Sequence, residues 1–81
     1  MPDPRLAGIE SQLRGGDARG ALGVADALIA NPALAGGDRF AALMLRSRIH
    51  EALGNLPAAI ADIEGALALN ARDARGYNEL G

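Results

Sequence analysis

The fold is decided by residues 38–69, which read DRFAALMLRSRIHEALGNLPAAIADIEGALAL. Apolar residues recur there at intervals of three and four, the spacing that places side chains on one face of an α-helix, and the pattern breaks at Gly54 and Asn55. Asp38 is placed to cap a helix before the break, and Asn55 to cap one after it, with Pro57 in the first turn. Because so few residues separate the two helices, the stretch predicts an antiparallel helical hairpin.

The two helices of this hairpin are expected to bury different faces. The first carries two adjacent stripes, which predicts burial on two sides. One stripe consists of Phe40, Leu43, Ser47 and His50, and the other of Leu45, Ile49 and Leu53. The buried face predicted for the second helix consists of Ala59, Ile60, Ile63, Ala66, Leu67 and Leu69. Asp62 and Glu64 lie two residues apart and cannot face each other on a helix, so they do not indicate a paired-carboxylate acid/base site. We expect both to face solvent.

Two more helices are predicted before the hairpin. Asp3 followed by proline is typical of a helix start, and the glycine pair 15–16 is expected to end that helix. Asp17 is placed to cap the next helix. That helix is expected to end at Asn31, because a residue that precedes proline is pushed out of the helical region. Residues 33–37 are expected to form a loop.

A fifth helix is predicted at the C-terminal end. Residues 70–72 are expected to close the fourth helix, and Asp73 is placed to cap a short helix over residues 74–80. Signals for β-strands are nearly missing, since the chain has a single Val, no Thr and no long alternation of apolar and polar residues. We therefore expect an all-α fold built as a run of antiparallel helical hairpins.

The composition limits what the chain can do chemically. A chain of 81 residues allows one small domain, and a large catalytic cleft is not expected. There is no Cys, so disulfides and thiolate metal sites are excluded. The net charge of −2 does not indicate a polyanionic partner. No apolar run is long enough for a membrane span or a signal peptide, so we expect no membrane contact and a cytoplasmic location.

No arrangement of residues predicts catalysis. His50 is the only histidine and lacks partner ligands, so we interpret it as a structural residue. The glycine pairs lack the Lys-Ser/Thr of a phosphate-binding loop, and neither Ser11 nor Ser47 lies in a nucleophile turn. We therefore expect no catalytic residues, no enzymatic activity, no cofactor and no bound metal.

The second half of the chain contains a repeat of 34 residues, the distance from Leu43 to Tyr77. Its pattern of large, small and helix-breaking positions resembles the tetratricopeptide repeat (TPR) family. The positions that carry the resemblance are Leu43, Ser47, Gly54, Ala59, Ile63, Ala66, Leu69, Tyr77, Leu80 and Gly81. The chain departs from the family at Arg46 and His50, where an apolar or aromatic residue is usual, and at Ala71, which replaces a proline.

The resemblance covers most of the chain as a single domain, residues 1–81. It implies a divergent repeat over about residues 3–32, a loop at 33–37, a clear repeat over about 40–73 and the start of a third repeat at 74–81. The expected architecture is a TPR-like α-solenoid of about two repeats plus a truncated fifth helix.

The resemblance also implies that the first helix of each hairpin lines a groove, which binds an extended peptide or a helix of a partner protein. The groove residues are then Met44, Arg48, Glu51, Arg75 and Asn78. Arginine grips a carboxylate with two hydrogen bonds and methionine adapts to varied apolar shapes, so such a face suits an acidic or mixed peptide. The alternative is that these arginines are plain solvated helix residues.

Other interpretations stay open. The chain can be a targeting or dimerising segment of a larger enzyme such as a transferase, because repeats of this family often precede a catalytic domain. It can also self-associate through helix faces that two repeats leave uncovered. RNA binding is less favoured, since the net charge is negative and no basic stripe is present. A chaperone-tail adaptor is disfavoured too, because the chain has no lysine and Leu45 stands where that subgroup has asparagine.

Overall fold

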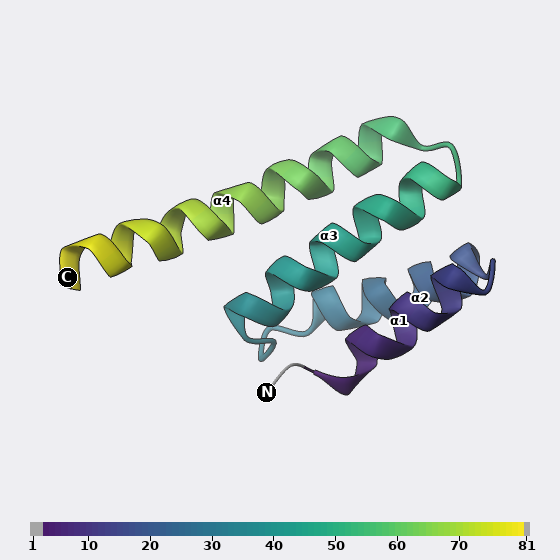
Figure 1. The fold of residues 1–81 in the computed structure, drawn as a ribbon, viewed down its shortest axis with the longest axis horizontal. Helices are drawn as coiled ribbons and strands as arrows, with labels where there is room; N and C mark the ends of the chain where they lie inside the picture. Colours follow the sequence, from purple (N-terminus) through teal and green to yellow (C-terminus); the bar gives the residue numbers. More distant parts are fainter. Residues whose placement is uncertain (1–2, 81) are drawn as a thin grey trace.

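The computed structural model describes the backbone of residues 3–80 and the side chains of residues 3–70. Over this part of the chain there are four α-helices and no strand (Figure 1). Helix α1 spans Pro4–Arg14, α2 spans Ala18–Ala30, α3 spans Gly36–Ala52 and α4 spans Leu56–Leu80. The expectation of an all-α fold is therefore confirmed for the described residues.

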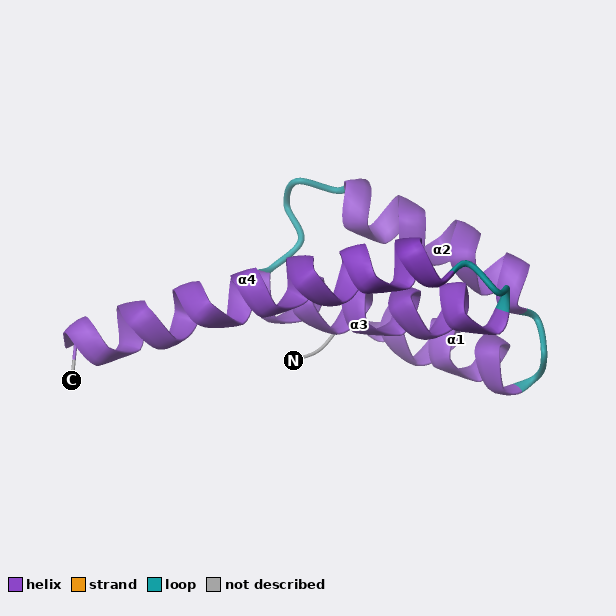
Figure 2. Ribbon diagram, turned by 90° about the horizontal axis from the view of Figure 1, so that it is seen from above, coloured by secondary structure: helices purple, strands orange, loops and turns teal. Residues whose placement is uncertain are grey.

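Helix α3 lies at the centre of the arrangement. It packs against α2 and α4, and it also touches α1. Each helix runs back along its predecessor, so that α1 and α2 form one hairpin and α3 and α4 form another (Figure 1). Figure 2 shows the C-terminal part of α4 projecting beyond the other three helices. The central place of α3 agrees with its two predicted stripes, of which Leu45, Ser47 and Ile49 are buried. Leu53 is exposed, because α3 ends at Ala52 and Leu53 lies beyond the packed part of the helix.

Helix ends follow caps that the sequence predicts. The Asp3 carboxylate accepts a hydrogen bond from the Arg5 N–H at 2.9 Å, and the Asp17 carboxylate accepts one at 3.0 Å from a backbone N–H in the first turn of α2. Each bond satisfies a donor that the first turn of a helix leaves without a partner. Gly16 and Gly54 make the turns after α1 and α3 with left-handed φ angles of 86° and 79°, which are unfavourable for other residues.

The connection between α2 and α3 is shorter than expected. Helix α3 begins at Gly36, ahead of Asp38, so the prediction of a loop over 33–37 is wrong at its C-terminal end. The reason is that Leu34 is buried in the core and anchors the connection there. The chain leaves this anchor through Ala35, which is extended, and turns at once into the helix.

Arg39 closes the C-terminal end of α2. Its guanidinium donates hydrogen bonds to the carbonyl oxygen of Ile29 at 2.6 Å and to that of Asn31 at 2.7 Å. Carbonyls at the end of a helix lack partners within the helix, and a positive charge there is favoured by the helix dipole. Arg39 therefore ties the start of α3 to the end of α2.

The core contains many small residues. Its buried apolar members are Leu6, Ile9, Ala21, Ala25, Leu28, Leu34, Ala42, Leu45 and Ile49. On α4, Ala59 and Ala66 are buried, as the sequence predicts. Alanine at these points lets helix backbones approach closely, so part of the alanine excess is a packing requirement.

Helix α4 buries a narrower face than expected. Ile60 and Leu67 each leave 56% of their surface exposed, so the prediction that they are buried is wrong. Ile63 and Leu69, which belong to the same predicted face, are only half-buried. The side of α4 that faces α3 carries Ala59, Asp62 and Ala66, which are all buried. Among the described helices only α3 packs against α4, so the side that carries Ile60 and Leu67 has no cover there.

The predicted fifth helix is not a separate element. Helix α4 continues without a break to Leu80, through residues 70–72, where the sequence predicts a helix end, and past Asp73. No glycine or proline interrupts the stretch 67–75, and its alanines and arginines favour continuation of a helix. Residues 74–80 of the expected third repeat are therefore an extension of α4. The side chains of its repeat positions Tyr77 and Leu80, and Gly81 as a whole, lie outside the described residues.

Candidate functional site

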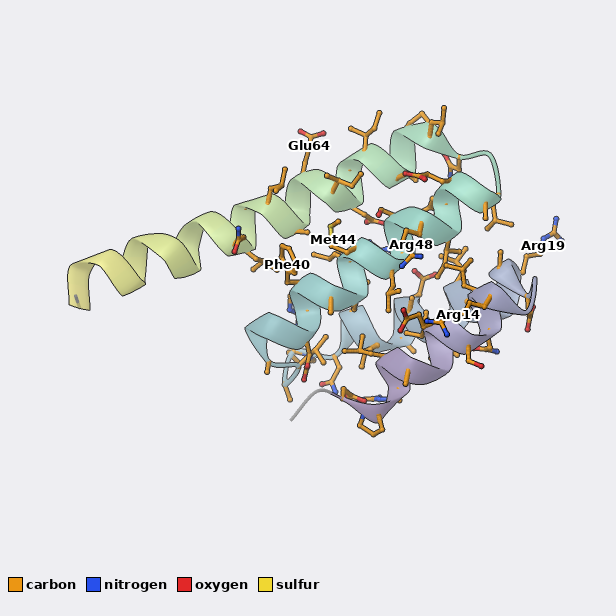
Figure 3. The ribbon with its side chains drawn as sticks, in the orientation of Figure 1. Arg14, Arg19, Phe40, Met44, Arg48 and Glu64 are labelled. Atoms are coloured by element: carbon orange, nitrogen blue, oxygen red, sulfur yellow. The ribbon has the colours of Figure 1, made fainter. Side chains whose placement is uncertain are left out.

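Three of the predicted groove residues lie on one accessible face of α3. Met44, Arg48 and Glu51 are spaced four and three residues apart, which places them on the same side of the helix. Met44 is half-buried, whereas Arg48 and Glu51 are exposed. Figure 3 shows Met44 and Arg48 one turn apart along α3. We call these three residues the α3 face.

The other two predicted groove residues are Arg75 and Asn78. Both residues lie on the C-terminal extension of α4, and their side chains are outside the part that the structure describes. Because α4 is the second helix of its hairpin, the expectation that these two residues begin the first helix of a further hairpin is wrong.

The three arginines of α3 differ in what they contact. Arg39 binds the end of α2, and Arg46 forms ion pairs with neighbouring helices. Arg48 makes no hydrogen bond or ion pair with any residue from 3 to 70, and Glu51 makes no ion pair with them. Within the described chain, Arg48 and Glu51 therefore present their charges to solvent.

A cluster of polar side chains joins α2, α3 and α4. We call it the Arg46 cluster, and it contains Asp26 on α2, Arg46 and His50 on α3, and Asp62 on α4. Asp62 accepts two hydrogen bonds from Arg46, at 2.9 Å from Nε to Oδ2 and at 2.6 Å from Nη2 to Oδ1. Nη1 of Arg46 donates to Oδ1 of Asp26 at 3.0 Å. Nε2 of His50 lies 3.5 Å from Oδ2 of Asp62.

The Arg46 cluster is built around a buried carboxylate. Asp62 is only 5% exposed, while the side chains of Arg46 and Asp26 are 23% and 55% exposed. A buried carboxylate needs a partner, and the planar guanidinium engages both of its oxygens at once. Hydrogen bonds to Asp62 raise the pKa of the Arg46 guanidinium above its ordinary value; partial burial opposes the shift and the bond to Asp26 adds to it. Arg46 therefore stays charged and fastens the three helices together.

The prediction that Asp62 faces solvent is wrong, whereas Glu64 is exposed, as the sequence predicts. The sequence contains a signal for the buried pair. Arg46 and Asp62 each lie eight residues from Gly54, so an antiparallel hairpin that turns there brings them opposite each other. Arg46 and His50 also lie four residues apart on one stripe, which points to a shared polar partner on the facing helix.

The Arg46 cluster is suited to holding helices together. Both oxygens of Asp62 already accept hydrogen bonds, and no pocket is found in the part of the chain that the structure describes. Among the same residues, no group of three or more His, Asp or Glu side chains could hold a metal ion. A bilayer crossing needs a long apolar helix, and none is found in the described chain.

Comparisons with family models, with curated proteins and with solved structures found no match to this chain. The resemblance to the TPR family therefore stays a prediction. What can be said of function rests on the contacts and charges of the α3 face and of the helices that support it.

Proposed function

We propose that the chain is a non-catalytic protein-interaction module, whose α3 face binds an extended peptide or a helix of a partner protein. The observation that carries the proposal is the state of Arg48. It is the one arginine of α3 that has no internal partner among residues 3–70, and it lies one turn from the half-buried, apolar Met44. An unpaired guanidinium beside an apolar contact is a common combination in protein-binding surfaces.

Helix α3 supplies a firm support for such a face. Its opposite sides are held by the core through Leu45 and Ile49, by Arg39 at the end of α2 and by the Arg46 cluster. A surface whose backbone is already ordered loses little conformational entropy when a ligand binds. A partner would therefore meet a preformed row of side chains.

We further infer that the two hairpins are arranged as TPR-like units. Buried small residues at Ser47 and Ala59, together with the left-handed turn at Gly54, support this inference. Contact of α3 with α1 as well as α2 supports it too, because each hairpin of a solenoid stacks on its neighbour. In that arrangement α1 and α3 are the first helices and lie on the same side of the molecule.

The side chains of the α3 face define the ligand by its chemistry. Arg48 can bind a carboxylate with two parallel hydrogen bonds, and Met44 can accommodate an apolar side chain of irregular shape. Glu51, less than one turn beyond Arg48, favours a cation or an amide. The complementary segment therefore carries Asp or Glu beside an apolar residue, with Lys, Arg or an amide on the far side. Phosphate backbones are disfavoured, since Glu51 borders Arg48 and the net charge is −2.

A peptide selected from a random display library against the whole chain tests the proposal. Its Kd is measured for the parent, for Arg48→Ala and for Arg19→Ala, since Arg19 is an exposed arginine on α2 that Figure 3 places away from the α3 face. We expect Arg48→Ala to weaken binding by about 10- to 100-fold, the loss of a hydrogen bond between charged groups, and Arg19→Ala to change it by less than about twofold. Equal effects of the two variants would refute the assignment of the α3 face.

A further inference from the structure

An apolar stripe runs along a side of α4 that α3 does not cover. We define the α4 stripe as Leu56, Ile60, Ile63 and Leu67, which follow one another at intervals of four, three and four residues and so share one side of the helix. Leu56, Ile60 and Leu67 expose 59%, 56% and 56% of their surface, and Ile63 is half-buried. Figure 3 shows side chains standing out along the edge of α4 away from α3, with Glu64 labelled among them.

The α4 stripe is not what holds α4 in place. Helix α4 is attached to α3 by another side, through the buried Ala59 and Ala66 and through the pairing of Asp62 with Arg46. The stripe extends over roughly 16 Å of helix, and its exposed side chains make an apolar patch on the order of a few hundred Å². The largest apolar patch on a typical monomeric protein is of this size and is often functional.

The shape of the α4 stripe fits a helix. Its side chains form a ridge at helical spacing, which packs into the groove between ridges of another helix. Laying the apolar face of an amphipathic helix against such a surface is one of the recurring modes of peptide recognition. An occupant that covers the stripe needs about three helical turns, with apolar residues at intervals of three and four.

Charge decides which kind of helix fits. Glu64 is exposed at the border of the α4 stripe, one turn after Ile60, and it makes no ion pair with the described residues. The only other charged side chain described on α4 is Asp62, which is paired with Arg46. The charged side chains described on α4 are therefore both negative, and a helix complementary to this side of α4 carries Lys or Arg beside its apolar residues.

A second copy of the chain is a poorer occupant than such a helix. If two α4 stripes pair in antiparallel fashion around a two-fold axis, each residue near the middle of one stripe meets the middle of the other. Glu64 lies near the middle of the stripe, so the two Glu64 residues would lie on the same border, offset from each other by roughly 8 Å along the helix axis. Like charges at this distance oppose the pairing.

The geometry points to the α4 stripe as a docking surface for a basic amphipathic helix of a partner protein. Leu56, Ile60 and Leu67 provide the apolar contact, and Glu64 selects a cation on the partner. This surface is formed by residues of α4, whereas the α3 face is formed by residues of α3, so the two proposals rest on different helices.

Two synthetic helical peptides serve as probes. Each has about 18 residues, five turns, with Leu at intervals of three and four and Ala and Gln elsewhere; one has Lys beside the Leu stripe and its twin has Glu there. Fluorescence anisotropy measures their binding to the whole chain and to exposed-site variants. We expect the Lys peptide to bind at least about tenfold more tightly than its twin, and Glu64→Lys to reverse this order. Ile60→Ser and Leu67→Ser should each weaken binding by about tenfold or more.

Matched controls separate docking from loss of fold. Ala61 and Ala68 are exposed on α4 outside the stripe, so Ala61→Ser and Ala68→Ser should leave binding unchanged, and circular dichroism should be the same for all variants. Arg48→Ala should also leave binding of the Lys peptide unchanged. This variant therefore distinguishes a failure of the present proposal from a failure of the proposal that the α3 face binds a partner. Absence of binding, or equal effects of Ile60→Ser and Ala61→Ser, would overturn the proposal. So would a concentration-dependent dimer in sedimentation that Ile60→Ser abolishes, because the occupant would then be a second copy.

Discussion

Replacement of Asp62 by asparagine tests whether the Arg46 cluster holds the helices together. Asp62→Asn keeps the size of the side chain but removes the negative charge that Arg46 and His50 approach. Breaking a buried ion pair from one side costs ~3–5 kcal/mol, because the remaining charge is left without its partner. Arg46 retains Asp26 at 3.0 Å and has 23% of its side chain in water, so we expect a smaller loss of about 2–3 kcal/mol.

Urea and thermal unfolding followed by circular dichroism measure this loss. For a domain of this size it corresponds to a fall in Tm of about 10–20 °C. Glu64→Gln is the matched control, because it makes the same change of charge on the same helix at an exposed carboxylate, and it should stay within about 0.5 kcal/mol of the parent. A double variant, Arg46→Met with Asp62→Leu, should recover most of the stability, since it leaves no buried charge without a partner.

Two results would refute the reasoning. If Asp62→Asn is no less stable than Glu64→Gln, the cluster does not fasten α3 to α4. If the double variant is less stable than Asp62→Asn alone, the fit of the side chains, and not the pairing of charges, sets the cost.

Three further changes test other contacts of the fold. Arg39→Gln leaves two carbonyl oxygens at the end of α2 without a charged donor, and we expect urea unfolding to show a loss of about 1–2 kcal/mol; an unchanged midpoint would rule out this role. Gly65→Ala places a Cβ 3.6 Å from Cδ1 of Leu43, which is an ordinary van der Waals contact. Because alanine is the better helix former, the change should raise the free energy of unfolding by about 0.5–1 kcal/mol. A lower free energy of unfolding would contradict the spacing of α3 and α4. Hydrogen bonds from the Arg5 side chain, and to a smaller extent from its backbone N–H, lower the pKa of Asp3 below 3.8. The charged carboxylate therefore adds to the stability of the fold above pH 3.8, and this stability is lost as the pH falls through the lowered pKa. Asp3→Asn should therefore melt below the parent at about pH 7 and together with it at about pH 2, and a difference independent of pH would contradict this cap.

The helix ends could be predicted because their causes are local. Asp3 and Asp17 cap helices through their own side chains, Asn31 ends one because proline follows it, and Gly54 makes a turn that other residues resist. The start of α3 could not be predicted in the same way. It depends on Leu34 reaching the core, which no short window of sequence contains.

The shared face of Met44, Arg48 and Glu51 also follows from the sequence, because helical spacing alone places them on one side. Helical spacing does not show, however, whether an arginine on α3 is available to a ligand. Arg46 and Arg48 lie two residues apart with the same chemistry, yet Arg46 is engaged by two carboxylates and Arg48 by none among residues 3–70. The difference is set by which helix each residue faces.

By itself the sequence determined that the chain is helical, where most helices begin and end, and which side chains share a face, since all of these depend on contacts within a few residues. Only the tertiary structure decided that Asp62 is buried and that Ile60 and Leu67 are exposed, because the rotation of α4 about its axis depends on the surface of α3. The observed orientation of α4 turns Asp62, Ala59 and Ala66 toward α3, where Asp62 pairs with Arg46. Burial of the large aliphatic residues alone would favour another orientation, with Ile60 and Leu67 against α3. A paired buried charge tolerates little displacement, whereas an exposed aliphatic side chain costs only a modest free energy.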